Sequence, residues 1–493
     1  MTDQVVRWRE VEPLRALNGD IENLLATVDT VRTAWEEHLQ FVSPEEFEAA
    51  RRRTLRRHAI ETGIIERLYD LSWGITEALV AEGITRQVVA REGGISEDTL
   101  AIVNSQLDAL DMLVDAVRVG RPLTVSFIKE LHAAITRSQA TYDARDQFGH
   151  LVRRPLRHGA WKEFPNDVVR ADGSRLEYTP PEHVQSEVER LLARYEETAN
   201  SHPVVRAAWL HHRFVLIHPF QDGNGRVARA LTLMVLLQAR YAPLVVDRTQ
   251  RADYIDALDA ANADDLRPLI RLFAGLELVA LKSELSAPVS QASYATGVVP
   301  VARELVGRLQ ERKRSENEQR AASSSELAIA VQAMVVDELR RLATELEPEF
   351  RAVDTNARTT VNHAAPGMEQ AMYWRGQIVY TAKHVDFFAD LHNGSWWTSM
   401  YVNALSQTLR FLVIIQKVGH GDLGVLAVTT FAEVLDRDQQ PGSVEFRRAF
   451  EPTPKDSVTL VHTNSPDDRW QEVADLIDRT LSTALKFFVD QLS

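Results

Sequence analysis

The sequence predicts a mainly α-helical chain: a helical bundle that carries a small β-hairpin flap, followed by a separate α+β carboxy-terminal domain. Two observations lead to this prediction. Apolar residues recur at spacings of three and four over most of residues 43–285, as on the buried faces of packed helices. After residue 325 the pattern changes, because short segments rich in aromatic and β-branched residues precede a last amphipathic stretch.

The amino-terminal segment, residues 1–42, contains a helical pattern around residues 21–39 and suggests no role. A helix start follows, in which Ser43 can cap, Pro44 suits the first helical position and Glu46 completes a capping box. The helix that begins here continues through an arginine-rich stretch, residues 51–57, which is most simply a solvated face.

Further bundle helices are expected after the capping residues Ser96 and Thr124, and at residues 182–197, 204–217, 227–237, 252–260 and 265–285. Residues 141–179 lose the helical period. Within them, residues 161–165 and 175–178 flank a turn signal at residues 171–174, which predicts a two-stranded hairpin. We call residues 161–178 the flap.

Residues 286–325 are predicted to be a linker with a connecting helix, because residues 286–300 are rich in Ser, Ala, Pro and Gly. The carboxy-terminal domain, residues 326–493, should contain a helix at 326–345 and a final helix at 470–492. Strand-like segments lie at residues 370–381, 396–403, 409–418, 423–431 and 457–463, with a hairpin turn at 419–422. No family and no ligand is evident for this domain.

Composition narrows the class of protein. The chain has 493 residues, with 56 Lys or Arg against 70 Asp or Glu, so its net charge at neutral pH is −14. This balance argues against a nucleic-acid partner, which requires a basic surface. The chain has no cysteine, so it can form neither disulfides nor thiolate metal sites. A polar amino terminus and the lack of a long apolar run predict no membrane partner and a cytoplasmic location, while a homo-oligomer stays open.

One stretch combines the parts that phosphate chemistry requires. It runs His218-Pro219-Phe220-Gln221-Asp222-Gly223-Asn224-Gly225-Arg226-Val227-Ala228-Arg229, between two apolar segments with helical spacing. The glycines permit backbone angles that turn several N–H groups to one side, and the start of the second helix favours an anion. Arg226 and Arg229 lie three apart, so both can reach one ligand.

Two further residues of this stretch supply a metal ligand and a base. Asp222 offers a hard oxygen ligand for Mg2+, which typically binds one or two carboxylates together with substrate phosphates. His218 is the general base of the stretch, because an ordinary imidazole has a pKa of ~6.5 and can accept a hydroxyl proton near neutral pH. We call residues 218–229 the catalytic loop.

The catalytic loop resembles the signature of the Fic family, His-Pro-Phe-x-Asp-Gly-Asn-Gly-Arg-x-x-Arg, at every specified position. The resemblance extends to residues 207–217 in the preceding helix, to residues 128–132 and to residues 178–181, so that it covers residues 50–285. It implies transfer of AMP from ATP to a Ser, Thr or Tyr hydroxyl of a target protein. Family members that act as kinases carry a variant loop, whereas this chain has the form of the AMP-transferring members.

The resemblance also implies a role for each residue of the catalytic loop. His218 would deprotonate the target hydroxyl, and Asp222 would bind the Mg2+ that bridges the ATP phosphates. Arg226 would contact the phosphates and Arg229 would hold the γ phosphate. The residues that would form the anion hole are Gly223, Asn224 and Gly225. Phe220 would anchor the loop in the core.

A second feature of the family is an inhibitory helix with the pattern Ser/Thr-x-x-x-Glu-Gly/Asn, whose Glu pairs with the last Arg of the catalytic loop. Thr62 to Glu66 fits the first part, whereas Arg67 stands where Gly or Asn is expected. Glu61 competes for the role, but the residue four positions before it is neither Ser nor Thr. We expect Glu66 to be inhibitory, since a carboxylate on Arg229 would occupy the place of the γ phosphate.

The family also places a flap beside the catalytic loop, where the backbone of the target adds as an extra strand. The resemblance therefore implies that a protein target docks on the flap, residues 161–178. An ordinary structural hairpin is the competing interpretation.

Several alternatives to AMP addition remain open: removal of AMP from a protein, transfer of another phosphate-containing group, and a nucleotide-sensing module without turnover. His211 and His212 are expected to be packed helix residues. A zinc site with His211, His218 and a carboxylate fits the spacing, but neither a His-Glu-x-x-His pattern nor a cysteine supports it.

Overall fold

The structure is a computed structural model, which describes residues 5–17, 21–39, 42–85, 88, 95–145, 150–170, 173–285, 300–391, 394–419, 423–436 and 446–492. The chain forms two compact units. The first, which we call the bundle unit, contains residues 1–21 and 45–280. The second, which we call the sheet unit, contains residues 22–44 and 281–493.

The amino-terminal segment predicted at residues 1–42 is thus divided between the units. Its first residues pack in the bundle unit, whereas helix α1 (Glu22–Leu39) packs in the sheet unit. Of the predicted linker, residues 286–299 lie outside the described residues. From residue 300 on, the predicted linker is already part of α12 (Pro300–Arg351), and the predicted helix at 326–345 lies inside this longer helix.

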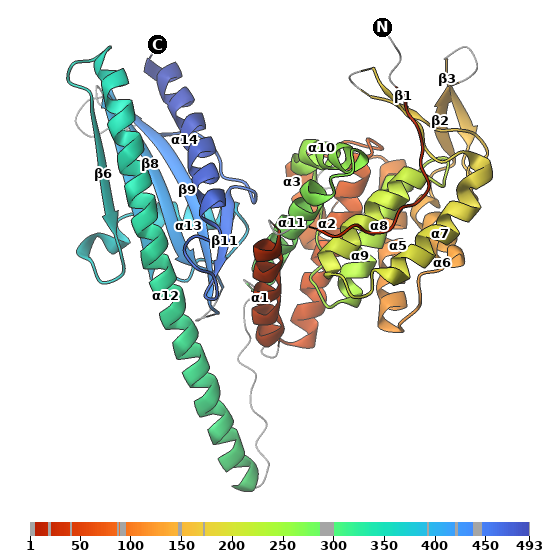
Figure 1. The fold of residues 1–493 in the computed structure, drawn as a ribbon, viewed down its shortest axis with the longest axis horizontal. Coiled ribbons are helices and arrows are strands. Elements are labelled where there is room, and N and C mark those ends of the chain that lie inside the picture. Colours follow the sequence, from red (N-terminus) through yellow and green to blue (C-terminus); the bar gives the residue numbers. More distant parts are fainter. Residues whose placement is uncertain are drawn as a thin grey trace. The chain divides into compact units, whose positions relative to one another are not determined.

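The bundle unit consists mainly of helices. They are α2 (Pro44–Ile65), α3 (Trp73–Glu82), α5 (Glu97–Arg118), α6 (Val125–Thr136), α7 (Val184–Glu197), α8 (Pro203–Ile217), α9 (Asn224–Gln238), α10 (Arg251–Asn262) and α11 (Arg267–Leu285), with short 3-10 turns at Pro181–His183 and Arg248–Gln250. Local capping fixes two of the starts, because the side chains of Ser96 and Thr124 accept hydrogen bonds from the N–H groups of Thr99 and Phe127. Both predicted caps are confirmed. Figure 1 shows α8 and α9 side by side in the bundle unit.

Two small sheets accompany these helices. β2 (Thr141–Arg145) and β3 (Leu151–Pro155) form an antiparallel hairpin that was not predicted. In the flap, β4 (Val168–Val169) pairs with β5 (Arg175–Leu176), and the tight turn between them includes a hydrogen bond from Arg170 N–H to Ser174 O. Residues 171 and 172 of the predicted turn lie outside the described residues. On the other side of β5 lies β1 (Val5–Val6), which runs parallel to it.

The prediction of a strand at residues 161–165 was wrong. These residues are irregular, and the N–H of Lys162 donates to the carbonyl of Pro219 at 2.9 Å, so this backbone is bonded to the catalytic loop and not to a neighbouring strand. The aromatic residues that suggested a strand pack instead against the loop, as Trp161 does against Phe220 with ring centroids 4.9 Å apart. This irregular segment therefore positions the site.

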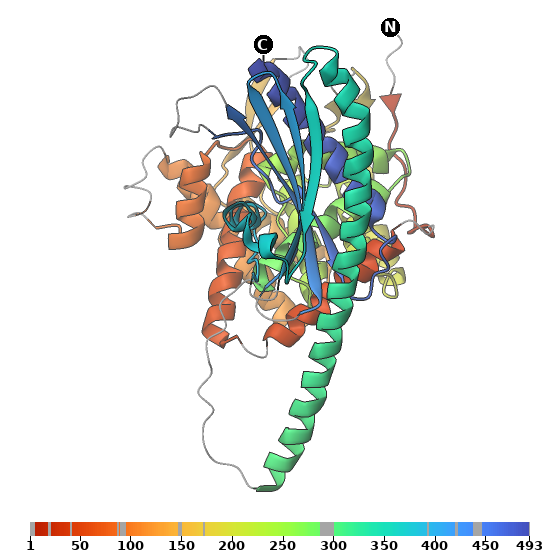
Figure 2. The same ribbon diagram turned by 90° about the vertical axis from the view of Figure 1, so that its left-hand side faces the viewer.

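The sheet unit contains an antiparallel sheet with helices on both faces. Its strands are β6 (Arg358–Ala364), β7 (Ser395–Ala404), β8 (Gln407–Lys417), β9 (Val425–Asp436), β10 (Phe446–Arg448) and β11 (Ser457–Val461), and its other helices are α13 (Arg375–His384) and α14 (Trp470–Leu492), with a 3-10 turn at Glu369–Met372. The order is β10-β9-β8-β7-β6, and β11 also pairs with β9. α12 and α14 cover one face of the sheet, and one end of α12 extends beyond it (Figures 1 and 2).

The other face of the sheet shows why one predicted strand was wrong. Residues 370–381 form the 3-10 turn and α13 because Trp374 and Ile378, four apart, pack on the same core as Trp397 and Phe431. Strand β6 was not predicted, since its polar sequence and largely accessible residues are those of an edge strand. The predicted turn at 419–422 falls mainly outside the described residues. Among the described helices, none is long and apolar enough to cross a membrane.

Candidate active site

His218 stands at the carboxyl end of α8, where the backbone leaves the helix. It adopts a left-handed conformation (φ 50°, ψ 56°), and its N–H still donates to Phe214 O at 3.0 Å. Its ring Nδ1 lies 3.1 Å from the carbonyl of Val215. Because a carbonyl can only accept, Nδ1 carries the hydrogen and Nε2 bears the free lone pair. His218 is thus oriented as a base that accepts a proton at Nε2.

The ring of His218 is stacked on the ring of Tyr178, with centroids 3.9 Å apart and an interplanar angle of 10°. Burial, followed by the positive charge of Lys162, lowers the pKa of His218 well below its ordinary value. The imidazole is therefore neutral at pH 7, as a base must be, but in this state it binds a proton more weakly than the expected pKa of ~6.5 implies.

The catalytic loop is fixed from inside by two side chains. The amide of Asn224 accepts from Phe220 N–H at 2.8 Å and donates to Phe220 O at 2.7 Å. The ring of Phe220 is fully buried and stacks on His132 with centroids 3.7 Å apart. His132 Nε2 in turn lies 3.0 Å from the carbonyl of Asp222. The side chain of Asn224 thus holds the loop in shape, which leaves the backbone N–H groups as the anion-binding part of the predicted hole.

Asp222 is the carboxylate best placed for a cation. Its Oδ1 accepts from Gly223 N–H, and its Oδ2 accepts from the amide of Gln139, both at 2.6 Å. The side-chain oxygen Oε1 of Gln139 accepts from Arg226 Nη2, also at 2.6 Å. Gln139 therefore joins the candidate metal ligand to the candidate phosphate ligand. Sequence reasoning missed it, because nothing in its neighbourhood distinguishes it from a polar residue after α6.

Whether Mg2+ fits is decided by the donors near Asp222. Its side chain is 37% exposed, so an ion can approach it from solvent. No group of three or more His, Cys, Asp or Glu side chains that could hold a metal occurs among the described residues. A single accessible carboxylate nevertheless suits Mg2+, which often binds one protein carboxylate and takes its other ligands from phosphate oxygens and water.

The guanidinium groups of Arg226 and Arg229 are buried, with side chains 1% and 3% exposed. Burial lowers the pKa of Arg226, although an arginine remains cationic at neutral pH. Its Nε and Nη1 atoms find no hydrogen-bond partner within the described part of the chain. Buried cationic N–H groups without acceptors are costly, so the site favours an anionic group beside Arg226.

Glu66 lies at the end of α2 and reaches the same site. Its Oε1 is 2.6 Å from Arg229 Nη2, and Arg229 Nε donates to the hydroxyl of Thr62 at 2.6 Å. The carboxylate also lies against Gly225, where an added Cβ atom would clash with Glu66 Oε1. A negative charge therefore occupies the space between Arg229 and the backbone of the catalytic loop.

The competing carboxylate, Glu61, has a different partner. It is fully buried and accepts hydrogen bonds from the backbone N–H of Arg248 at 3.0 Å and from its Nη2 at 2.6 Å. Arg248 also lies over the ring of Trp73. Glu61 thus ties α2 to the 3-10 turn before α10, and of the two candidates only Glu66 contacts Arg229 in the described structure.

His211 and His212 are packed side chains, as expected. His211 lies within hydrogen-bond distance of the hydroxyls of Thr232 (2.9 Å) and Tyr254 (2.7 Å), and His212 contacts Asn262 Oδ1 at 3.0 Å. The zinc alternative finds no support, because the described residues contain no metal-binding cluster.

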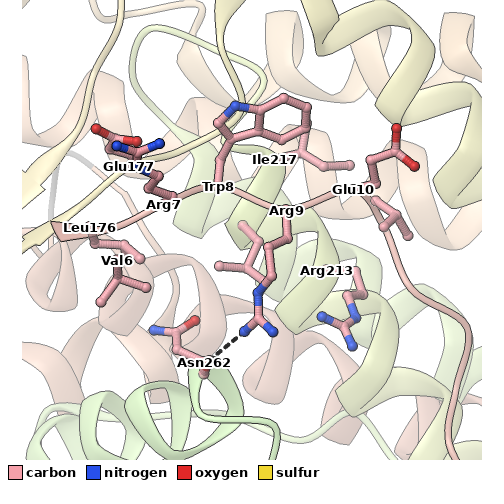
Figure 3. Close-up of a pocket in the computed structure, with 12 residues that line it drawn as sticks. Val6, Arg7, Trp8, Arg9, Glu10, Leu176, Glu177, Arg213, Ile217 and Asn262 are labelled. Atoms are coloured by element: carbon pink, nitrogen blue, oxygen red, sulfur yellow. Dashed lines mark hydrogen bonds between the residues drawn. The ribbon is translucent and has the colours of Figure 1, made fainter.

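Away from the loop, residues of the amino-terminal segment line a small hollow of about 20 Å³. Figure 3 shows the residues around it. There Arg9 donates to the carbonyl of Asn262 at 3.2 Å, beside Trp8 and Arg213. None of the residues that line it belongs to the catalytic loop.

Residues 122–236 match a known family, described as the Fic/DOC family. The chain is similar to the protein adenylyltransferase Fic of Drosophila persimilis, at 30% identity over 199 residues, which cover 39% of this chain and 36% of that protein. It is also similar to the protein adenylyltransferase Fic of Culex quinquefasciatus, at 28% identity over 277 residues, which cover 51% of each. The similarity thus spans at most about half the length of these two relatives.

Two solved structures are also similar to part of this chain. One is a Fic-domain-containing signaling protein from Bacteroides thetaiotaomicron, with 25% identity, a TM-score of 0.44, and coverage of 54% of this chain and 100% of that chain. Another is Fic-1 from C. elegans, with 24% identity, a TM-score of 0.42, and coverage of 54% and 72%.

Proposed function

The chain carries a domain of the Fic/DOC family at residues 122–236, and from this premise we propose that it is a protein adenylyltransferase. The observation that carries the proposal is the arrangement in one loop of a base, a carboxylate and an anion site. His218 presents a free Nε2, Asp222 is accessible to a cation, and Arg226 has buried N–H groups without acceptors among the described residues. This combination suits a nucleoside triphosphate as substrate.

The proposed reaction transfers AMP from ATP to a hydroxyl of a target protein. His218 Nε2 takes the hydroxyl proton, the oxygen forms a bond to the α phosphorus, and the bond from that phosphorus to the bridging oxygen breaks, so that pyrophosphate leaves. A phosphate beside the ring favours the imidazolium and raises the pKa of His218 from its low value in the ATP-free state. Asp222 would hold Mg2+, which would supply positive charge to neutralise the phosphates. Arg226 and Arg229 bind phosphate oxygens.

Glu66 provides the proposed inhibition. Its carboxylate forms an ion pair with Nη2 of Arg229 and lies against Gly225. A γ phosphate and this carboxylate therefore compete for the guanidinium of Arg229. Two anions in one buried basic site repel each other, and ATP then binds in a pose that does not favour transfer. Removal of the Glu66 side chain should therefore raise the rate of transfer.

The flap offers the proposed docking edge for the target protein. The edge of β5 is already taken by β1, whereas the outer edge of β4 has no strand partner among the described residues. Val168 and Val169 in β4 are 43% and 71% exposed. An extended segment of the target can add to this edge through backbone hydrogen bonds, which would bring its hydroxyl toward His218 with little demand on its sequence.

The position of the label in ATP tests the reaction type. We would incubate the Glu66→Gly protein with a cell lysate and ATP that is labelled at either the α or the γ phosphate. Transfer of AMP leaves only the α label on protein, whereas the His218→Ala change in the same background should abolish it. Incorporation of the γ label would indicate phosphoryl transfer. Release of AMP from modified protein by the wild type, lost in Glu66→Gly, would indicate AMP removal.

A further inference from the structure

Lys162 lies in the irregular segment of the flap and contacts the backbone on both sides of His218. Its backbone N–H donates to Pro219 O at 2.9 Å, and its Nζ lies 3.5 Å from Ile217 O. Nζ also donates to Asn166 Oδ1 at 2.7 Å. One residue thus binds the carbonyls immediately before and after the candidate base.

Burial of the Lys162 amine carries a desolvation penalty that lowers the stability of the fold. Lys162 is only 4% exposed, and its hydrogen-bond acceptors are a carbonyl and an amide, both neutral. Among the described residues, no carboxylate lies within ion-pair distance of it. The nearby Asp167 instead accepts from Tyr178 N–H and from Arg175. Because an apolar side chain of similar length would avoid the desolvation penalty, stability alone does not explain a lysine here.

The backbone of His218 needs support of this kind. A residue other than glycine in the left-handed region is strained, and such strain persists only where the surroundings hold it. The Nδ1–H bond to Val215 O and the stack on Tyr178 both depend on that backbone angle. Lys162 also faces the other side chain of the stack, since its Nζ is 5.8 Å from the centroid of the Tyr178 ring.

We propose that Lys162 is a positioning residue for His218, which fixes the left-handed turn through the carbonyls of Ile217 and Pro219. The imidazole then presents Nε2 to the substrate hydroxyl. The bond to Pro219 O comes from the backbone N–H and survives any substitution here except proline, whereas the contact with Ile217 O requires the Nζ donor, which both the ammonium and the neutral amine supply. The inference rests on the proposed function for its kinetic consequence, but not for its structural one.

The kinetic test compares the Glu66→Gly protein with the same protein carrying the additional change Lys162→Met. We expect kcat for AMP transfer to fall by about tenfold or more, because a misplaced base slows proton transfer, while the Kd for ATP changes by less than about twofold. The exposed Lys383, in the sheet unit, gives the matched control Lys383→Met. In Lys162→Ala, added ethylammonium should restore part of kcat, because it can occupy the vacated site and supply the donor.

A second readout is independent of activity. Nitrogen NMR of the His218 ring in ATP-free Lys162→Met should show loss of the single Nδ1–H tautomer, whereas the Lys383→Met spectrum should match that of the parent. If the Glu66→Gly parent transfers no AMP, the proposed function fails and the NMR result still decides the role of Lys162. An unchanged ring spectrum and an unchanged kcat would overturn the inference. An equal loss of kcat, ATP affinity and melting temperature, without rescue by ethylammonium, would also overturn it.

Discussion

Arg67, the residue directly after Glu66, stands where the Fic pattern has Gly or Asn. Its backbone is left-handed (φ 57°), and its N–H donates to Ile64 O at 2.9 Å as α2 ends. Gly and Asn, which the Fic pattern has at this position, adopt such a conformation at lower cost than arginine. The end of the helix that carries Glu66 is therefore strained here by about 1 kcal/mol.

We predict that Arg67→Gly strengthens the proposed inhibition. Relief of the strain should favour the state in which Glu66 binds Arg229, so basal AMP transfer should fall by about fivefold, the equivalent of about 1 kcal/mol. Initial rates with α-labelled ATP measure the effect. Arg67→Ala removes the same side chain but keeps the strain, so it serves as the control. Equal rates for the Gly and Ala variants would contradict the role given to the backbone.

At the scale of elements, the amino-terminal segment secures the flap. β1 pairs with β5, and the ring of Trp8 stacks on His183 with centroids 5.2 Å apart. Further along, Arg9 binds Asp264 at 3.3 Å, and Val11 N–H donates to Glu187 at 2.8 Å. A pair of two-residue strands is weak by itself, so these anchors must keep β1 on the flap.

We predict that Trp8→Ala loosens the flap. Loss of the stack should remove about 0.5–1.5 kcal/mol that holds β1 in register. Backbone amide exchange at residues 168–177 should then become faster, with exchange in α9 unchanged. Arg7→Ala alters an exposed neighbour in the same segment and provides the control. The same exchange rates in all three proteins would show that β1 does not stabilise the flap.

The elements differ in how well local sequence could predict them. Helices such as α5 and α6 carry their own signals, namely a cap and an apolar stripe, and were predicted near their observed starts. The β1–β5 pair joins residues about 170 positions apart in the chain, and its strands are too short to show an alternating pattern. α13 was predicted as a strand because its aromatic residues suit either structure, and only packing against the sheet decides.

The residues of the candidate site also differ in whether local sequence could predict them. Residues 218–229 are contiguous, so a base, a metal ligand and an anion site could be proposed from their spacing, while the role of each residue came from the resemblance. Spacing alone left Glu61 and Glu66 open, and only the resemblance favoured Glu66, since their partners, Arg248 and Arg229, come from elsewhere in the chain. Gln139 and Lys162 were missed for a similar reason, because each reaches the loop only through the fold.

On the scale of the whole molecule, the bundle unit buries several histidines in the neutral form. Burial, together with nearby arginine charges, lowers the pKa of His58, His132 and His211 to about 3. In the unfolded chain these groups titrate at ~6.5. Between pH 6.5 and pH 3 the unfolded state therefore binds more protons than the folded state. The stability that these histidines contribute is complete above pH 6.5 and is lost as the pH falls.

We predict that the free energy of unfolding falls on acidification from pH 7 to pH 5, by up to about 2 kcal/mol for each such histidine. Urea unfolding at the two pH values measures the loss. His58→Gln removes one titrating group, so this variant should lose about 2 kcal/mol less than the parent over the same interval. His150→Gln changes an exposed histidine and is the control. Equal losses for His58→Gln and the parent would contradict the account.

The most direct measurement is the rate at which AMP from ATP becomes attached to protein, in wild type, Glu66→Gly and Glu66→Gly with His218→Ala. If Glu66 competes with the γ phosphate for Arg229 and His218 is the base, the rate of AMP transfer by Glu66→Gly should be at least about tenfold higher than that of wild type. This increase is expected when a competing negative charge is removed from the phosphate site. The double variant should show no transfer. Equal rates for wild type and Glu66→Gly, or a double variant as active as Glu66→Gly, would contradict the central claim.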